Sequence, residues 1–229
     1  MPTTRSVLQS AAILALSASP LLAQAAGRLI DEGTFNITRP GAPPATESFR
    51  IRSGDGGTII ATGQLIAGAH RINSALTTDS LGTPMEYHVQ VRENGTPTLT
   101  VSAVARAGRL SARSQLARGD ESMREYPVVA GNCLVLDDEL LHQTYFVAII
   151  KRTGNVQVIK PRAAHGGTLT VQARGLEPIT VAGRQVTATR YAIVNGSAER
   201  NFWVDAAGRL LQIEVPSTGL KATREELPR

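Results

Sequence analysis

The chain has 229 residues, of which 42% are hydrophobic, so it is long enough to form one domain with a substantial core. Its formal net charge is +5, but the cations are scattered and lack the clustering and interleaved aromatic residues of a nucleic-acid site. Its single cysteine, Cys133, excludes an intramolecular disulfide, so the fold must be stabilised by packing alone.

The first 26 residues have the pattern of a secretory signal peptide. Arg5 precedes a short apolar run at residues 11–16, and Ala23 and Ala25 then form a small-x-small cleavage site. No later stretch approaches about 20 apolar residues, so no transmembrane segment is predicted. We therefore expect an exported protein, periplasmic or extracellular, in which residues 27–229 form a single β-rich domain.

Most of the remaining chain shows the alternation of apolar and polar residues that is typical of strands. Residues 84–92 are the clearest case, and Asn94-Gly95 follows them as a hairpin turn. The expected strands are 29–38, 47–53, 58–66, 70–78, 84–92, 98–105, 109–117, 121–129, 155–160, 167–174, 179–181, 184–194, 199–205, 209–215 and, at an edge, 220–225. This spacing predicts an all-β, mainly antiparallel, strongly curved sheet that forms a half-barrel or barrel.

One long segment, residues 133–150, departs from the strand pattern. It predicts a helix near 137–150 that is inserted into the sheet and begins with Asp137 as its N-cap. Such a helix places five side chains on one face: Leu140, Leu141, Thr144, Tyr145 and Ala148. Its opposite face carries Phe146 and is apolar too, so we expect the helix to be buried inside the sheet or across its open side.

The best candidate pair for chemistry is Asp138 and His142, four residues apart on the predicted helix. Such a pair can bind a metal or orient an imidazole, but no third ligand is identifiable, and the pair is more often a helix-stabilising contact. The sequence also contains no nucleophile signature and no phosphate-binding loop. We therefore predict no catalytic residue, no bound metal and no cofactor.

The closing hairpin at residues 201–216 has the sequence Asn-Phe-Trp-Val-Asp-Ala-Ala-Gly-Arg-Leu-Leu-Gln-Ile-Glu-Val-Pro. It resembles the C-terminal hairpin of several uncharacterised exported bacterial β-protein families. Together with the meander and the inserted helix, it is similar in layout to the half-barrel of the LolA/LolB lipoprotein carriers. This resemblance implies a sheet curved around an apolar ligand cavity that helices cap, and no ligand residue can be carried over from it.

Three hypotheses about function follow. The first is an exported, non-enzymatic binding or envelope-associated module that holds an apolar or lipid-like ligand, with Leu141, Tyr145, Phe146 and Trp203 as candidate contacts. The second is an enzyme that uses Asp138, His142 and a third group delivered by the fold. The third is a structural domain that pairs with another exported protein through an edge strand. A pocket lined only by apolar side chains favours the first, a pocket with several convergent ionisable groups favours the second, and a closed core with an exposed apolar edge favours the third.

Overall fold

The structure is a computed structural model that describes residues 27–149 and 153–229, so the predicted signal peptide lies outside the described part. The N-terminal half is a run of eight strands: β1 (Leu29–Thr38), β2 (Ala45–Ser53), β3 (Ile59–Ala67), β4 (His70–Thr78), β5 (Pro84–Glu93), β6 (Thr96–Arg106), β7 (Arg109–Leu116) and β8 (Glu121–Pro127). The C-terminal half contributes seven: β9 (Cys133–Val135), β10 (Gly154–Lys160), β11 (His165–Val181), β12 (Arg184–Asn195), β13 (Ala198–Val204), β14 (Leu210–Val215) and β15 (Leu220–Arg224). The helical segments are short: η1 (Asp55–Gly57), η2 (Leu141–Thr144), α1 (Tyr145–Ile149), η3 (Pro161–Ala163) and η4 (Pro216–Thr218).

All these strands belong to one open sheet. Their order is β8-β7-β6-β5-β4-β3-β2-β1-β15-β14-β13-β12-β11-β10-β9. β9 and β10 are parallel, and the other neighbours are antiparallel. The predicted fold class, a curved and mainly antiparallel sheet with one inserted helix, is confirmed.

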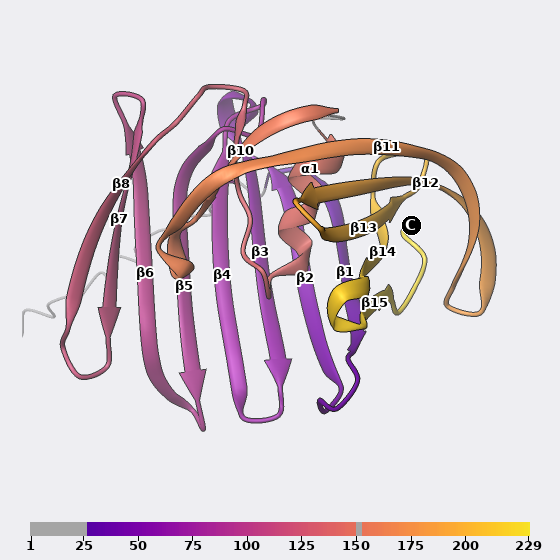
Figure 1. The fold of residues 1–229 in the computed structure, drawn as a ribbon, viewed down its shortest axis with the longest axis horizontal. Helices are drawn as coiled ribbons and strands as arrows, with labels where there is room; N and C mark the ends of the chain where they lie inside the picture. The colour runs from indigo at the N-terminus through magenta and orange to yellow at the C-terminus, as the bar shows by residue number, and fades with distance from the viewer. Residues whose placement is uncertain (1–26, 150–152) are drawn as a thin grey trace, which may run out of the picture.

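The two halves of the sheet are joined where the first described strand pairs with the last. β1 and β15 are neighbours, and Phe35 lies opposite Arg224 in their register. In Figure 1 the N-terminal strands run side by side, and the C-terminal strands β11–β13 cross in front of them. α1 lies between these two parts (Figure 1), so the curved sheet encloses the inserted segment.

The main core lies on the inner face of this sheet. It combines side chains from both halves, such as Phe35, Leu76 and Phe202, with Leu140 and Phe146 of the inserted segment. A second, smaller core forms on another surface of the C-terminal half from four buried side chains: Val181, Ala188, Trp203 and Leu211. None of the helices in the described part of the chain is long and apolar enough to cross a membrane.

Three local predictions were wrong. The alternation in residues 84–92 predicts that Met85 lies on the buried face with Tyr87. Met85 is instead 41% exposed, because a register shift at Thr78 places it out of the alternation that buries Tyr87. The strands predicted at 167–174 and 179–181 are one strand, β11, which continues through a register shift next to Gly175 at φ 99°. The predicted edge strand at 220–225 is β15, which lies in the middle of the sheet between β1 and β14.

The inserted helix is buried, as predicted, but it is shorter and begins later. Asp137 is not an N-cap, because Leu140 is extended (φ −94°, ψ 90°) and only then do η2 and α1 begin. The Asp137 carboxylate accepts the backbone amide of Glu139 at 3.0 Å, which makes a turn before the helix rather than a cap on it.

Candidate functional site

The chain itself occupies the inner side of the curved sheet. The side chains of Leu140, Leu141 and Phe146 are each no more than 1% exposed, and Tyr145 is 4% exposed. All four pack in the main core against strands of both halves. The interior is therefore a packed core around the inserted segment.

Glu47 anchors this segment from β2. Its carboxylate accepts hydrogen bonds from the backbone amides of Leu141 (2.9 Å) and His142 (3.3 Å), at the start of η2. Its Oε1 also lies 2.5 Å from Nδ1 of His142, and both side chains are fully buried. Because these amides have no partner within the helix, Glu47 supplies from a distant strand the cap that the local sequence lacks.

The imidazole of His142 can approach the sheet because Gly63 on β3 has no side chain. A Cβ at Gly63 would lie 2.3 Å from Cε1 of His142. The ring also stacks on Phe49, with centroids 6.4 Å apart and planes 9° from parallel. Its Nε2 is buried and has no hydrogen-bond partner among the described residues. This geometry makes His142 an anchoring residue within the core.

A second polar cluster surrounds Asp137. Arg162 donates two hydrogen bonds of 2.7 Å to its carboxylate and a third to Glu139, and the Tyr87 hydroxyl lies 3.4 Å away. Burial alone would raise the pKa of Asp137, but the hydrogen bonds and charge of Arg162 outweigh it and hold the pKa below its ordinary value. Burial, with the Asp137 charge, raises the pKa of Tyr87 far above its usual range.

The structure does not bring Asp138 and His142 together. Asp138 Oδ1 lies 2.6 Å from Nζ of Lys160 and 3.7 Å from Nη2 of Arg200, whereas His142 faces Glu47. The predicted pairing was wrong because these residues straddle the extended turn before η2 instead of lying on one helix. The residues that the structure describes contain no group of three or more His, Cys, Asp or Glu side chains placed to hold a metal.

Three hollows border the segment Leu136–Leu141, and we call this segment with its hollows the rim. The lysine hollow, of about 130 Å³, has an apolar floor and is edged by charged side chains; its lining includes Leu136, Leu169, Ile193, Val215, Lys160 and Arg200. The leucine hollow, of about 120 Å³, is lined mainly by apolar side chains, among them Ile37, Leu65, Leu141 and Leu220. A third hollow of about 300 Å³ shares Asp138 and Lys160 with the lysine hollow and adds Asp137 and Arg162.

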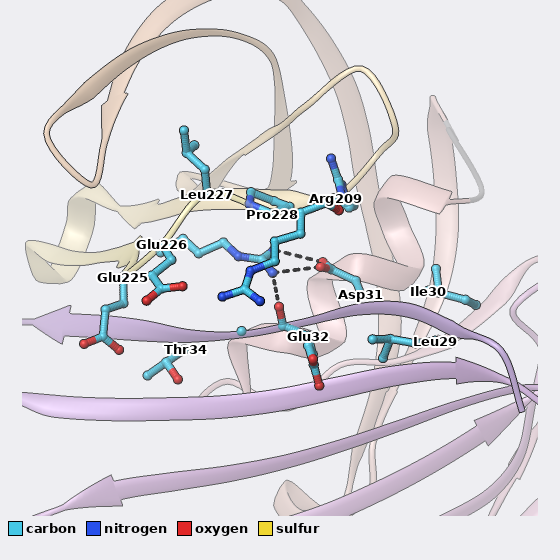
Figure 2. A pocket seen from close by; sticks show the side chains of 13 residues that line it. Leu29, Ile30, Asp31, Glu32, Thr34, Arg209, Glu225, Glu226, Leu227 and Pro228 are labelled. Carbon is cyan, nitrogen blue, oxygen red and sulfur yellow. Dashed lines mark hydrogen bonds and ion pairs between the residues drawn. The ribbon is translucent and has the colours of Figure 1, made fainter. Parts of the chain in front are cut away.

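A larger groove, of about 520 Å³, lies between β1 and the C-terminal residues (Figure 2). The buried Arg224 guanidinium lines it and donates to the Asp31 carboxylate at 2.8 and 3.0 Å, to Leu210 O at 3.0 Å and to Glu32 O. These contacts connect β1, β14 and β15. Cζ of the guanidinium also lies 5.2 Å from the ring centroid of Phe49. Arg224 is thus engaged in joining the two halves of the sheet, so we place the candidate site at the rim instead.

The four residues predicted to contact a ligand are all buried, but they do not form one site. Leu141, Tyr145 and Phe146 belong to the main core. Trp203 belongs to the smaller core. Its Nε1 donates to Oε1 of Glu177 at 2.5 Å, and Cζ of Arg190 lies 5.4 Å from the centroid of its ring. Of the four, only Leu141 also lines a hollow of the rim.

Sequence reasoning missed Glu47, Arg162 and Arg200. For Glu47 a signal was present, because it shares the alternation of Phe49 and Ile51 and therefore points with them into the core. The partners of Arg162 and Arg200 come from segments 25 and 62 residues away, and no local pattern indicates them.

A search among curated proteins found no match. Among solved structures, the chain is similar to the crystal structure of a β-barrel-like protein of the domain of unknown function DUF1849 from Brucella abortus. The TM-score is 0.56 at 9% identity, over 87% of this chain and 97% of that one. At this identity the match supports the fold alone, and it does not confirm the LolA/LolB-like layout. The profile of the domain of unknown function DUF6134 matches residues 86–225, which is more than half of the chain. The chain therefore belongs to the DUF6134 family.

Proposed function

We propose that the protein is an exported, non-enzymatic binding module of the bacterial envelope that holds an apolar or lipid-like ligand against its curved sheet. The ligand lies at the rim, and the interior stays filled by the chain's own segment. The N-terminal pattern of Arg5, an apolar run and the small residues Ala23 and Ala25 supports export.

The observation that carries this proposal is the pair of small, partly apolar hollows that residues of Leu136–Leu141 help to line. Leu136 contributes to the floor of the lysine hollow, and Leu141 to the wall of the leucine hollow. Ligand sites are typically concave and mostly apolar, with a few polar groups that fix orientation. Here Lys160, Arg200 and Glu139 are those polar groups. Each hollow is far smaller than a cavity for a whole lipid, so the ligand inserts one part and leaves the rest outside.

The test is native mass spectrometry of the protein purified from its own host, in the form that the host accumulates. We expect a fraction of molecules with an added mass that organic extraction removes, and that returns when the extract is added back. Two variants fill the hollows with a larger side chain: Ala198→Leu for the lysine hollow and Ala67→Leu for the leucine hollow. Each should retain less of the bound ligand than the wild type. Absence of any extractable mass from freshly purified protein, together with no uptake from the host's lipid extract, would contradict the proposal.

A second candidate function is pairing with another exported protein through β8. Among the strands that the structure describes, β8 has a neighbour on one side only, and it carries Met123 at 72% exposure. Its exposed charges, Glu121, Arg124 and Glu125, are typical of edges protected against unspecific pairing. A partner that cross-links in the host to a residue placed at Met123, and not to one placed at Leu176, would favour this function.

A further inference from the structure

The lysine hollow combines an apolar floor with two cations at its edge. Leu136 and Ile193 are 3% and 6% exposed and form part of the floor. The side chains of Lys160 and Arg200 are 22% and 15% exposed, so both positive charges are largely withdrawn from water. Such a pairing of apolar surface with desolvated cations matches a ligand that has an anionic group at the end of an apolar part.

The two cations of this hollow keep N–H donors that no group in the described part of the chain accepts. Nζ of Lys160 has three N–H donors and contacts Oδ1 of Asp138 at 2.6 Å. The guanidinium of Arg200 has five N–H donors. Among the residues that the structure describes, only its Nη2 makes contacts, with the backbone oxygen of Asp138 at 3.1 Å and with the Asp138 carboxylate at 3.7 Å. Free donors on partly buried cations favour the binding of a further oxyanion.

Asp138 occupies the position that this oxyanion would take. Its carboxylate lies between Lys160 and Arg200, yet its side chain is 63% exposed and so has room to turn away. The other carboxylate at the edge, Glu199, faces Arg174 at 3.6 Å and Arg190 at 3.8 Å rather than Lys160 or Arg200.

We propose that Lys160 and Arg200 bind the anionic group of an amphiphilic ligand, a carboxylate or a phosphate ester, and that Asp138 is the internal counter-ion displaced by it. This inference rests on the proposed function, because it assigns the chemical class of the ligand at one hollow of the rim. The hollow has the volume of roughly four water molecules, so it takes the anionic group and the first carbons of the chain. The remainder of the apolar part lies outside, along the rim.

Calorimetric titration of the purified protein with decanoate and with decyl phosphate tests this site. Decyltrimethylammonium carries the same chain with the opposite charge, and acetate and inorganic phosphate carry the anion without the chain. We expect both decyl anions to bind, the cation to bind at least about tenfold more weakly, and the small anions to show no saturable binding. The affinity for the decyl anions should fall as salt rises.

Three variants separate the roles of the residues. Lys160→Gln and Arg200→Gln should each weaken decanoate binding by about tenfold or more, because each removes a charge-assisted contact. Asp138→Asn should strengthen it about threefold or more, since the competing carboxylate is gone. Lys221→Gln is the matched control, because Lys221 forms an exposed ion pair with Glu214 at 3.0 Å. The affinity of this variant for decanoate should equal that of the wild type.

These measurements distinguish a failure of the anion site from a failure of the proposed function. If the decyl anions and the decyl cation bind equally well and Lys160→Gln changes neither, the anion site is wrong while apolar binding at the rim stands. If neither binds and the neutral probe N-phenyl-1-naphthylamine does not bind either, the proposed function fails and this inference fails with it. Weaker decanoate binding in Asp138→Asn would overturn the role of Asp138 as a displaced counter-ion.

Discussion

Glu47 and His142 meet in the core at 2.5 Å, between Oε1 and Nδ1, although 95 residues separate them in the chain. Both side chains have 0% exposure. The same carboxylate accepts two backbone amides at the start of η2. One buried side chain of β2 therefore fixes the position of the inserted segment relative to the sheet.

Removing this carboxylate should be costly. Glu47→Ala leaves two buried amides and the imidazole without their acceptor, and we expect a loss of about 3–5 kcal/mol in the free energy of unfolding. Urea denaturation followed by tryptophan fluorescence measures it. Glu32→Ala is the control, because its pair with Arg50 is about half exposed, and it should cost no more than about 1 kcal/mol. Equal losses in the two variants would show that Glu47 does not anchor the segment.

A methyl group at Gly63 should displace the inserted segment. Gly63→Ala places Cβ 2.3 Å from Cε1 of His142, and overpacking of this kind typically costs about 1–3 kcal/mol. In a His142→Ala background the same substitution should cost clearly less, because the atom that it meets is gone. Gly167→Ala is the matched control, because Gly167 also lies in a strand and a Cβ there would come no closer than 3.4 Å to another atom, Nε2 of His165. This substitution should be tolerated. An equal cost of Gly63→Ala in both backgrounds would contradict the close approach.

The cluster around Asp137 predicts a dependence of stability on acidic pH. Since the folded state holds the pKa of Asp137 below its ordinary value, its contribution is present above about pH 4 and is lost as pH falls through the folded pKa. The free energy of unfolding should therefore decrease more steeply below pH 4 in the wild type than in Asp137→Asn. Denaturant titrations at pH 3, 4, 5 and 7 measure this difference, and parallel pH profiles would exclude the contribution of Asp137.

Processing of the N-terminus should follow the small residues at Ala23 and Ala25. We expect cleavage after Ala25 or Ala26, and N-terminal sequencing of the exported protein checks it. An intact Met1 on protein from a soluble cytoplasmic fraction would contradict export and the envelope location with it.

The sequence predicted most strands because their signal is local. A sheet with one face in the core imposes an alternation with period two, and β1 and β4 have the predicted boundaries. The same rule fails where a register shift adds a residue, as beside Thr78, since such a shift depends on the neighbouring strand.

The candidate site was much less predictable than the fold. Asp137 has the local pattern of an N-cap, but Arg162 binds its carboxylate and Glu47 takes over the capping of η2. Both partners arrive through tertiary contacts, and such contacts override local preference. Asp138 and His142 have helical spacing, but the extended residue Leu140 between them separates their side chains.

The central claim is that the interior stays filled by the inserted segment while the ligand binds at the rim. Unfolding of Leu141→Ala and Leu141→Asp, measured beside binding of a fluorescent fatty acid, tests it most directly. Leu141 is 1% exposed, so we predict that Leu141→Ala loses about 2–5 kcal/mol of stability, that Leu141→Asp loses more, and that folded Leu141→Ala still binds the probe. A loss of about 1 kcal/mol or less in Leu141→Ala, with probe binding abolished in Leu141→Asp, would instead show that the segment is a mobile lid over an internal ligand cavity.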